Sequence, residues 1–200
     1  MDDELTIDLD ETLLPLEPLS CFELSIDVGS APTLLPDLLN VQFAKVYLAL
    51  EDRGLSLRLV INDPFDQPSW RGDCVELLID THDLKSMTIT PFCHHFIILP
   101  ELVDGEKVRE VTRFRTEERH PIARPDQFEI VSRREGRKRH LEIFISKEAL
   151  HGYDLTRNGR LGFNYRVVGA SGQTQCLTAS WVDCPVEQHP VLWATVNREG

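Results

Sequence analysis

Apolar and polar residues alternate along most of this chain, and the pattern is clearest just after Trp70. From residue 74 onward, one side of the run carries three apolar side chains, Val75, Leu77 and Ile79. The other side carries the carboxylates of Glu76 and Asp80. A period of two residues is typical of a β-strand with one face in a core. The pattern therefore predicts a central strand within residues 70–81, with its two acids directed outward.

The same period recurs in short runs separated by glycine, proline and charged residues. The predicted strands are residues 21–28, 43–50, 55–61, 95–99, 107–114, 128–133, 139–145, 161–168, 174–179 and 192–196. Residues 51–54 predict a tight turn between the second and third of these. The one helical candidate is Ser146–Leu150, with Ser146 as its N-cap. The pattern indicates an all-β fold, a two-sheet antiparallel β-sandwich with at most one short helix.

The chain divides into a short arm and a single domain. Residues 1–19 are acidic, contain two prolines and show no sustained period, so they predict an N-terminal arm. Residues 20–200 are predicted to form one β-sandwich domain, because β-rich domains of this length often do not divide. With 42% hydrophobic residues, the chain can bury a large core without a disulfide framework.

Charge and cysteine usage narrow the partners and the compartment. A net charge of −12 repels phosphate, which argues against nucleic acid or an anionic membrane as a partner. The acidic start lacks the features of a signal peptide, and no apolar run approaches the roughly 20 residues that span a bilayer. Five cysteines without a Cys-x-x-Cys pair indicate reduced thiols. We therefore expect a cytoplasmic protein.

The segment around Trp70 resembles a known signature. A tryptophan followed by Gly-Asp-x-Val-Glu and an apolar strand ending in Asp80 is similar to family 9 carbohydrate-binding modules and their DOMON-like relatives. Later segments resemble later parts of that family, in the same order: residues 140–150, 161–167, 180–181 and 189–196. The resemblance implies a β-sandwich with a slot that clamps sugar rings between aromatic side chains. Those modules are usually appended to secreted enzymes, which differs from the compartment expected here.

Five residues are candidates for binding a saccharide: Trp70, Glu76, Asn164, Arg166 and Trp181. The C–H face of a pyranose packs on an indole, and its hydroxyls donate to carboxylates, so Trp70 near Glu76 suits a sugar. Asn164 and Arg166 are two apart on a predicted strand and share a face. The resemblance adds Trp181 as the second aromatic.

A purely structural interpretation of these residues stays open. Trp181 could fill the end of the sandwich, and Trp193 is expected to pack within it. Asn164 and Arg166 could form cross-strand pairs with Glu76 or Asp80 that only stabilise the sheet.

Catalytic patterns are absent from the sequence. It contains no Gly-x-Ser-x-Gly, Ser-x-x-Lys, Walker-type loop or His-Glu-x-x-His. Glu76 and Asp80 are four apart on one strand, about 13 Å by strand rise. That separation does not match the carboxylate pair of a glycosidase. The sequence therefore predicts a non-catalytic binding domain.

No metal-ligating set is predicted either. His94 and His95 are adjacent on a strand, so they face opposite ways and cannot easily share an ion. Asp80 and His82 would supply only two ligands. The resemblance allows a structural calcium, but the sequence has no Asp-x-Asp-x-Asp loop that would name its ligands. No other cofactor is expected.

The basic run at residues 133–140 predicts a charged hairpin tip in solvent. Glu135 and Gly136 form the expected turn. An anion or RNA contact is the alternative, but no aromatic residues interleave with the basic ones.

A second class of function also fits the predicted fold. The domain could be a structural or protein-interaction domain that binds no sugar. DOMON-like relatives include haem-binding domains, for which His94 or His95 could be an axial ligand with Met87 as partner.

Overall fold

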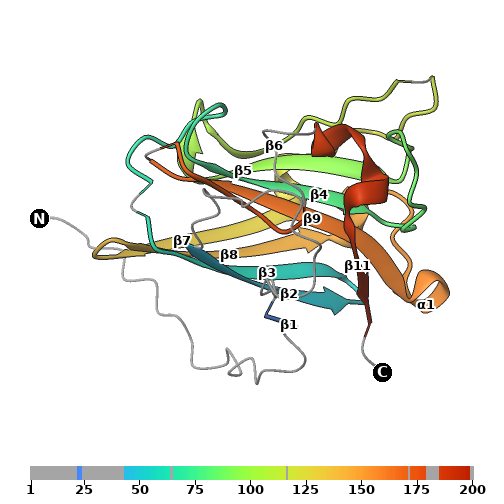
Figure 1. Ribbon diagram of the computed structural model, residues 1–200, viewed down its shortest axis with the longest axis horizontal. Helices are drawn as coiled ribbons and strands as arrows, with labels where there is room; N and C mark the ends of the chain where they lie inside the picture. The colour runs from blue at the N-terminus through green and yellow to red at the C-terminus, as the bar shows by residue number, and fades with distance from the viewer. Residues whose placement is uncertain are drawn as a thin grey trace, which may run out of the picture.

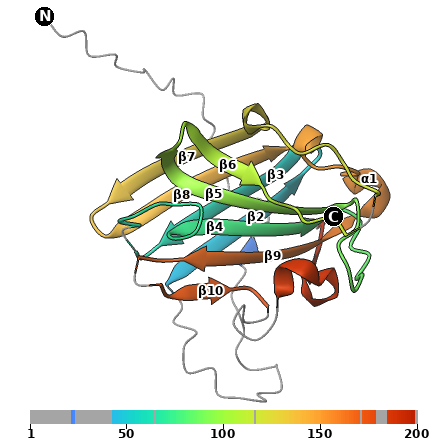
Figure 2. The same ribbon diagram turned by 90° about the horizontal axis from the view of Figure 1, so that it is seen from above.

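Two antiparallel β-sheets lie face to face in the computed structural model (Figure 1). It describes Phe22–Glu23 as backbone and residues 43–63, 65–115, 117–170, 172–178 and 185–198 in full. Seen from above, the strands of one sheet run obliquely to those of the other (Figure 2). Such an oblique alignment follows from the twist of each sheet. The predicted fold class is confirmed.

The first sheet has the order β1-β2-β3-β8-β7 and the second has the order β10-β9-β4-β5-β6, with β11 also paired to β9. The strands of the first sheet are β1 (Phe22–Glu23), β2 (Ala44–Glu51), β3 (Gly54–Ile61), β7 (Phe128–Glu135) and β8 (Lys138–Ser146). Those of the second are β4 (Cys74–Asp80), β5 (Cys93–Val103), β6 (Glu106–Glu110), β9 (Arg160–Val168), β10 (Thr174–Cys176) and β11 (Ala194–Asn197). The helical segments are η1 (Pro125–Gln127), η2 (Lys147–Ala149), α1 (Leu155–Asn158), η3 (Val186–Gln188) and η4 (Pro190–Leu192). All of them are too short to traverse a bilayer.

Most predicted strands are present, with differences at their ends. The strand predicted for residues 107–114 was too long, because β6 ends at Glu110. The amide of Val111 still donates to the carbonyl of His95, at 2.7 Å, and the described residues from there to 124 have no regular secondary structure. The strands predicted for residues 21–28 and 174–179 lie partly outside the described residues. The predicted arm, residues 1–19, lies wholly outside them.

The predicted helix at Ser146–Leu150 is a single 3-10 turn, η2. Ser146 occupies the N-cap position, but its side chain makes no capping hydrogen bond. The short helix α1 was not predicted. It begins where the Asp154 carboxylate accepts from the amide of Arg157, at 3.0 Å, and ends at Gly159, whose φ is +64°.

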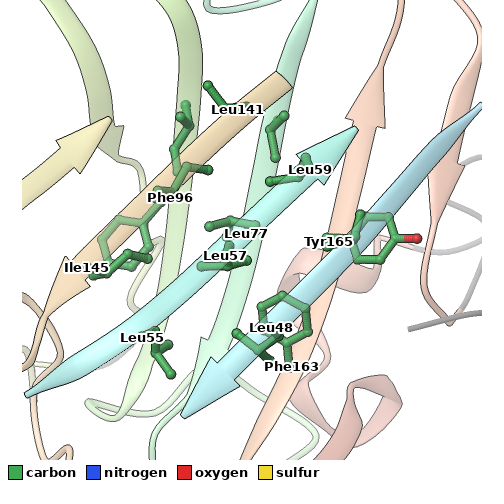
Figure 3. Close-up of a cluster of buried hydrophobic side chains, with 14 of the residues drawn as sticks. Leu48, Leu55, Leu57, Leu59, Leu77, Phe96, Leu141, Ile145, Phe163 and Tyr165 are labelled. Atoms are coloured by element: carbon green, nitrogen blue, oxygen red, sulfur yellow. The ribbon is translucent and has the colours of Figure 1, made fainter. Parts of the chain in front are cut away.

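The inner faces of both sheets form one hydrophobic core. Val75, Leu77 and Ile79 are each 0% exposed, as the alternation predicted. Figure 3 labels core residues from both sheets: Leu48, Leu55, Leu57 and Leu59 from β2 and β3, Leu77 and Phe96 from β4 and β5, Leu141 and Ile145 from β8, and Phe163 and Tyr165 from β9. Removing this apolar surface from water is the main term that holds the two sheets together.

A smaller apolar cluster covers part of the outer face of the second sheet. It contains Leu78 on β4, Ile89, Cys93, Val186 and Trp193. Trp193 is 2% exposed, and its indole N–H donates to the carbonyl of Val186 at 2.8 Å. Trp193 is therefore buried as expected, but it packs outside the sandwich rather than within it. The predicted strand at residues 192–196 begins only at Ala194 for the same reason.

The basic run forms the predicted hairpin between β7 and β8, with Gly136 at φ +59° in the turn. Residues 133–138 are exposed. Arg139 is an exception. It is buried and donates to the carboxylate of Glu101 at 2.9 Å, so it belongs to the folded body rather than to the charged tip.

Candidate functional site

The pairing register places four side chains in one row across the outer face of the second sheet. Arg109 on β6 is opposite Ile97 on β5, which is opposite Glu76 on β4, which is opposite Arg166 on β9. Paired residues share a face, and Val75 and Leu77 beside Glu76 point into the core, so this row points outward. Neighbouring strands are about 4.8 Å apart, so the row spans roughly 14 Å.

Glu76 lies at the centre of a buried polar network. One carboxylate oxygen, Oε1, accepts a hydrogen bond from Arg166, and the other, Oε2, accepts from Nε2 of His95 at 3.0 Å. Side-chain exposure is 5% for Glu76, 13% for His95 and 22% for Arg166. Burial alone would raise the pKa of Glu76, but the hydrogen bond from His95 and the charge of Arg166 outweigh it and lower that pKa. Glu76 is therefore a buried carboxylate that pairs with a cation, Arg166, and with an imidazole, His95.

The two acids of β4 are not the exposed groups that the sequence predicted. As whole residues, Glu76 is 4% exposed and Asp80 is 1% exposed. The Asp80 carboxylate accepts from the amides of His82, at 3.1 Å, and Leu84, at 2.8 Å, and so holds the turn after β4. Burial raises the pKa of Asp80, and these two hydrogen bonds offset part of that rise. The two acids are buried because His95 and Arg166 contact Glu76 and the turn after β4 wraps around Asp80, which the local pattern does not reveal.

Trp70 lies at the β6 end of the row, in the turn that precedes β4. The guanidinium carbon of Arg109 is 4.0 Å from the indole centroid, in cation–π geometry, and Arg109 also donates to Glu106 at 2.6 Å. The indole is partly exposed, but its Nε1 is buried and has no hydrogen-bond partner among the described residues. Trp70 thus presents an aromatic ring and an unused N–H donor beside a fixed cation.

Asn164 lies on the same outer face of β9, two residues before Arg166. It is opposite Leu78 on β4, and Leu78 is in turn opposite His95 on β5. The Oδ1 atom of Asn164 accepts from the amide of Tyr165 at 2.9 Å. The Nδ2 group is buried and, like the indole N–H of Trp70, lacks a partner within the described part of the chain. Buried donors of this kind are rare in folded proteins unless water or a ligand meets them.

The structure therefore brings three of the predicted residues together. Glu76, Asn164 and Arg166 share the outer face of β4 and β9, and Trp70 stands at the opposite end of the row. Trp181 lies outside the described residues, so a slot between Trp70 and Trp181 stays a prediction. His95 and Arg109 were missed. The pairing register of β5 and β6 places them, although the His94-His95 doublet did indicate one imidazole on each face.

His94 points the other way and belongs to a second cluster. Its Nδ1 is 3.0 Å from Oε1 of Glu110, and Nε2 of His120 is 2.7 Å from the same oxygen. All three side chains are fully buried. Burial raises the pKa of Glu110, but hydrogen bonds from His120 and His94 lower it to about 2. Burial lowers the pKa of His94.

These contacts bear on the metal and haem hypotheses. Among the described residues, His94, Glu110 and His120 are the one group of three or more metal-type side chains. Calcium takes six to eight oxygen ligands, so a set with two imidazoles does not fit it. Met87, the proposed haem partner, is 65% exposed, while both candidate histidines are bonded to glutamates. These contacts lend no support to a haem site.

Comparison with known proteins identifies the fold. No protein-family model matches the sequence, and no curated protein sequence matches it. A family 9 carbohydrate-binding module from Caldicellulosiruptor kristjanssonii, solved with cellotriose, matches with a TM-score of 0.56 at 18% identity, covering 78% of this chain and 75% of that one. A family 9 module from the same organism, solved with glucose, matches with a TM-score of 0.58 at 16% identity, covering 78% and 76%.

This chain has a CBM9-like fold. The ordered resemblance found in the sequence is thereby confirmed at the level of architecture. In the CBM9-like sandwich, the row from Trp70 to Arg166 lies on the outer face of one sheet, with its aromatic residue in the turn that leads into β4. What the two solved modules bind is a property of those modules, and it bears on this chain through the proposal below.

Proposed function

We propose that this protein is a non-catalytic domain that binds a saccharide on the outer face of its second sheet, between Trp70 and Arg166. One observation carries the proposal. A partly exposed indole, a buried carboxylate and two arginines stand in one row on a fold whose solved neighbours were captured with cellotriose and glucose.

The chemistry of the row suits sugar hydroxyls, which both donate and accept hydrogen bonds. A carboxylate has about four lone-pair sites, and the described contacts of Glu76 with Arg166 and His95 leave acceptor capacity for a hydroxyl. Arg109 and Arg166, whose side chains are 40% and 22% exposed, are donors that a ligand can reach. The Trp70 ring supplies apolar surface for the C–H face of a pyranose.

The row is fixed before any ligand arrives. Arg166 and His95 hold the Glu76 carboxylate, and the cation–π contact with Arg109 holds the Trp70 ring. Side chains that are already ordered lose little conformational entropy on binding, which favours affinity for a small ligand. We propose that these contacts orient the site, in addition to stabilising the sheet.

A titration calorimetry experiment tests this function. Cellotriose and glucose are titrated into the wild-type protein and into Trp70→Ala and Arg109→Gln. We expect heat of binding in the wild type and a loss of about tenfold or more in affinity, or about 1.4 kcal/mol, in each variant. The matched control is Arg134→Gln on the exposed β7–β8 hairpin, which should bind as the wild type does.

The competing function is a structural or protein-interaction domain. It is favoured by the ion pair between Arg166 and Glu76, which can stabilise the sheet without any ligand. Absence of binding heat for these and other mono- and oligosaccharides at millimolar concentration would support this function and contradict ours.

We also propose that the protein works in a reducing, cytoplasmic setting. Cys74 and Cys93 are buried free thiols, which supports this proposal. Burial raises the pKa of Cys74 to about 12 and that of Cys93 to about 11, so neither thiol is reactive in the folded protein. Fractionation of cells that express the full-length gene tests the compartment.

A further inference from the structure

We propose that His94, Glu110 and His120 bind a divalent transition-metal ion of the zinc type. Each side chain offers one donor atom, and these atoms lie within 4.8 Å of one another. The cluster is separate from the outer-face row, because His94 and Glu110 point to the inner side of the sheet. The inference therefore does not depend on the proposed saccharide site.

Three different parts of the chain build the cluster. His94 lies on β5, and Glu110 ends β6 opposite Phe96, so the two residues are diagonal neighbours on one face of the hairpin. His120 comes from the loop between β6 and η1. The ring centroids of the two histidines are 4.2 Å apart, and all three side chains are 0% exposed. The donors are thus fully enclosed by protein.

The hydrogen bonds of His120 place a lone pair against a carboxylate. Its Nδ1 is 2.6 Å from the carbonyl oxygen of Pro91, which can only accept, so Nδ1 carries a proton. In a neutral imidazole, Nε2 is then unprotonated, and it lies 2.7 Å from Oε1 of Glu110. A cation has to stand between these two atoms. It is either a second proton, shared by His120 and Glu110, or a metal ion, and a metal ion would also bind Nδ1 of His94 in place of the hydrogen bond to Glu110.

Two of the three donors, Glu110 and His120, make the outer hydrogen bonds that metal ligands usually make. Metal-binding histidines almost always donate their other ring N–H to a carbonyl or carboxylate, as His120 does to Pro91. Metal-binding carboxylates are themselves hydrogen-bonded. Here Oε2 of Glu110 accepts from the amide of Ala123 at 2.7 Å, and Oε1 accepts from the hydroxyl of Thr112 at 2.8 Å. Both partners fix the orientation of the donors from outside the cluster.

Two imidazoles and one carboxylate select the metal. This donor set suits zinc and similar transition ions, whereas calcium and magnesium prefer oxygen ligands alone. Metal–ligand bonds of about 2.1 Å in a tetrahedron put the donors about 3.4 Å apart. The present distances of 2.7 and 3.0 Å therefore have to widen by about 0.4–0.7 Å when an ion binds between these atoms. Three protein donors leave one position for a non-protein ligand.

The expected role of the ion is structural. It would tie residues 117–124, which have no regular secondary structure, to β5 and β6. An ion that binds only the folded state stabilises that state. Zinc should therefore raise the melting temperature of protein previously treated with a chelator.

Zinc titration of the full chain tests the site. Chelator-treated protein is titrated with zinc chloride by calorimetry, and wild type is compared with Glu110→Gln and His120→Gln. We expect one ion per chain and a loss of zinc affinity of about 100-fold or more in each variant. Removing a direct ligand should weaken binding at least as much as removing an outer hydrogen bond, which costs about 10–100-fold in metal affinity. The control is His140→Gln, which removes a half-buried histidine that pairs with the exposed Glu135 on the β7–β8 hairpin and should not change zinc binding.

A second measurement uses only the wild type, in case a variant fails to fold. Imidazole ¹H–¹⁵N spectra are recorded during the zinc titration. We expect the ring nitrogens of His94 and His120 to shift together while those of His140 do not. Absence of zinc binding at millimolar concentration, unchanged affinity in folded Glu110→Gln, or shifts confined to other histidines would each overturn the proposal.

Discussion

At the scale of single residues, the two described tryptophans occupy opposite environments. Trp193 is 2% exposed, packs against Leu78 and Val186, and has its N–H bonded. Trp70 is partly exposed and contacts Arg109. We expect Trp193→Ala to lower the free energy of unfolding by about 3–5 kcal/mol, as deletion of a buried aromatic does. Trp70→Ala should cost about 1 kcal/mol, the scale of an exposed cation–π contact.

Urea denaturation of both variants measures these costs. If Trp70→Ala unfolds the domain and Trp193→Ala is harmless, then Trp70 is a core residue and Trp193 is not, which contradicts both assignments.

Glu76 gives the protein an acid-dependent stability. Its pKa in the folded state is below the ordinary value of 4.5, so the unfolded chain takes up a proton more readily. The stabilisation is complete above the ordinary pKa and is lost as the pH falls through the lower, folded-state pKa. Glu76→Gln should therefore flatten the decline of the unfolding free energy below about pH 5. Urea denaturation at a series of pH values measures it, and an equally steep decline in the variant would contradict the ion-pair account.

At the scale of elements, the turn between β2 and β3 depends on Gly54. This residue has a φ of +151°, and a Cβ added there would lie 2.0 Å from the carbonyl oxygen of Ile145 on β8. We expect Gly54→Ala to destabilise the protein by more than about 1 kcal/mol, because backbone on two strands has to move. Gly136→Ala is the matched control, since Gly136 has a φ of +59° but open space around it. Equal losses of melting temperature in the two variants would show that the close approach to β8 does not matter.

Strand β4 shows which features a local sequence pattern predicts and which it does not. The alternation of Val75, Leu77 and Ile79 predicted their burial, because the period of a strand fixes which side chains share a face. The same pattern predicted exposed acids, and this was wrong for Glu76 and Asp80. Glu76 is buried partly by Arg166, which is more than 80 positions further along the chain. A local period cannot reveal such a partner.

The cluster of His94, Glu110 and His120 could not be predicted from the sequence, for a related reason. The sequence separates these residues irregularly, and only the β5–β6 register and the return of the following loop bring them together. The doublet of His94 and His95 still predicted correctly that the two imidazoles face opposite sides.

At the scale of the whole molecule, Gln175 on β10 connects the two sheets. Its Oε1 accepts from the amides of Phe43 and Ala44, and its Nε2 donates to the carbonyl of Ala44 and the hydroxyl of Tyr165, all at 2.8–2.9 Å. Gln175→Leu would leave several buried polar groups without partners, each costing about 1–3 kcal/mol. We expect a loss of at least about 2 kcal/mol in urea denaturation. Gln127→Leu in the exposed η1 turn should cost less than about 1 kcal/mol, and similar losses for both would contradict a special role of Gln175.

The fold, the outer-face row and its free donors together predict where a saccharide binds. Among the described residues, the indole N–H of Trp70 has no partner, whereas that of Trp193 is bonded to Val186. The most direct measurement is therefore the indole ¹H–¹⁵N spectrum during a titration with cellotriose. We expect the Trp70 signal to shift as its N–H or ring meets the sugar, while the Trp193 signal stays in place. An unchanged Trp70 signal up to about 10 mM cellotriose, where even weak binding of about −4 kcal/mol would be evident, would contradict the proposed saccharide site.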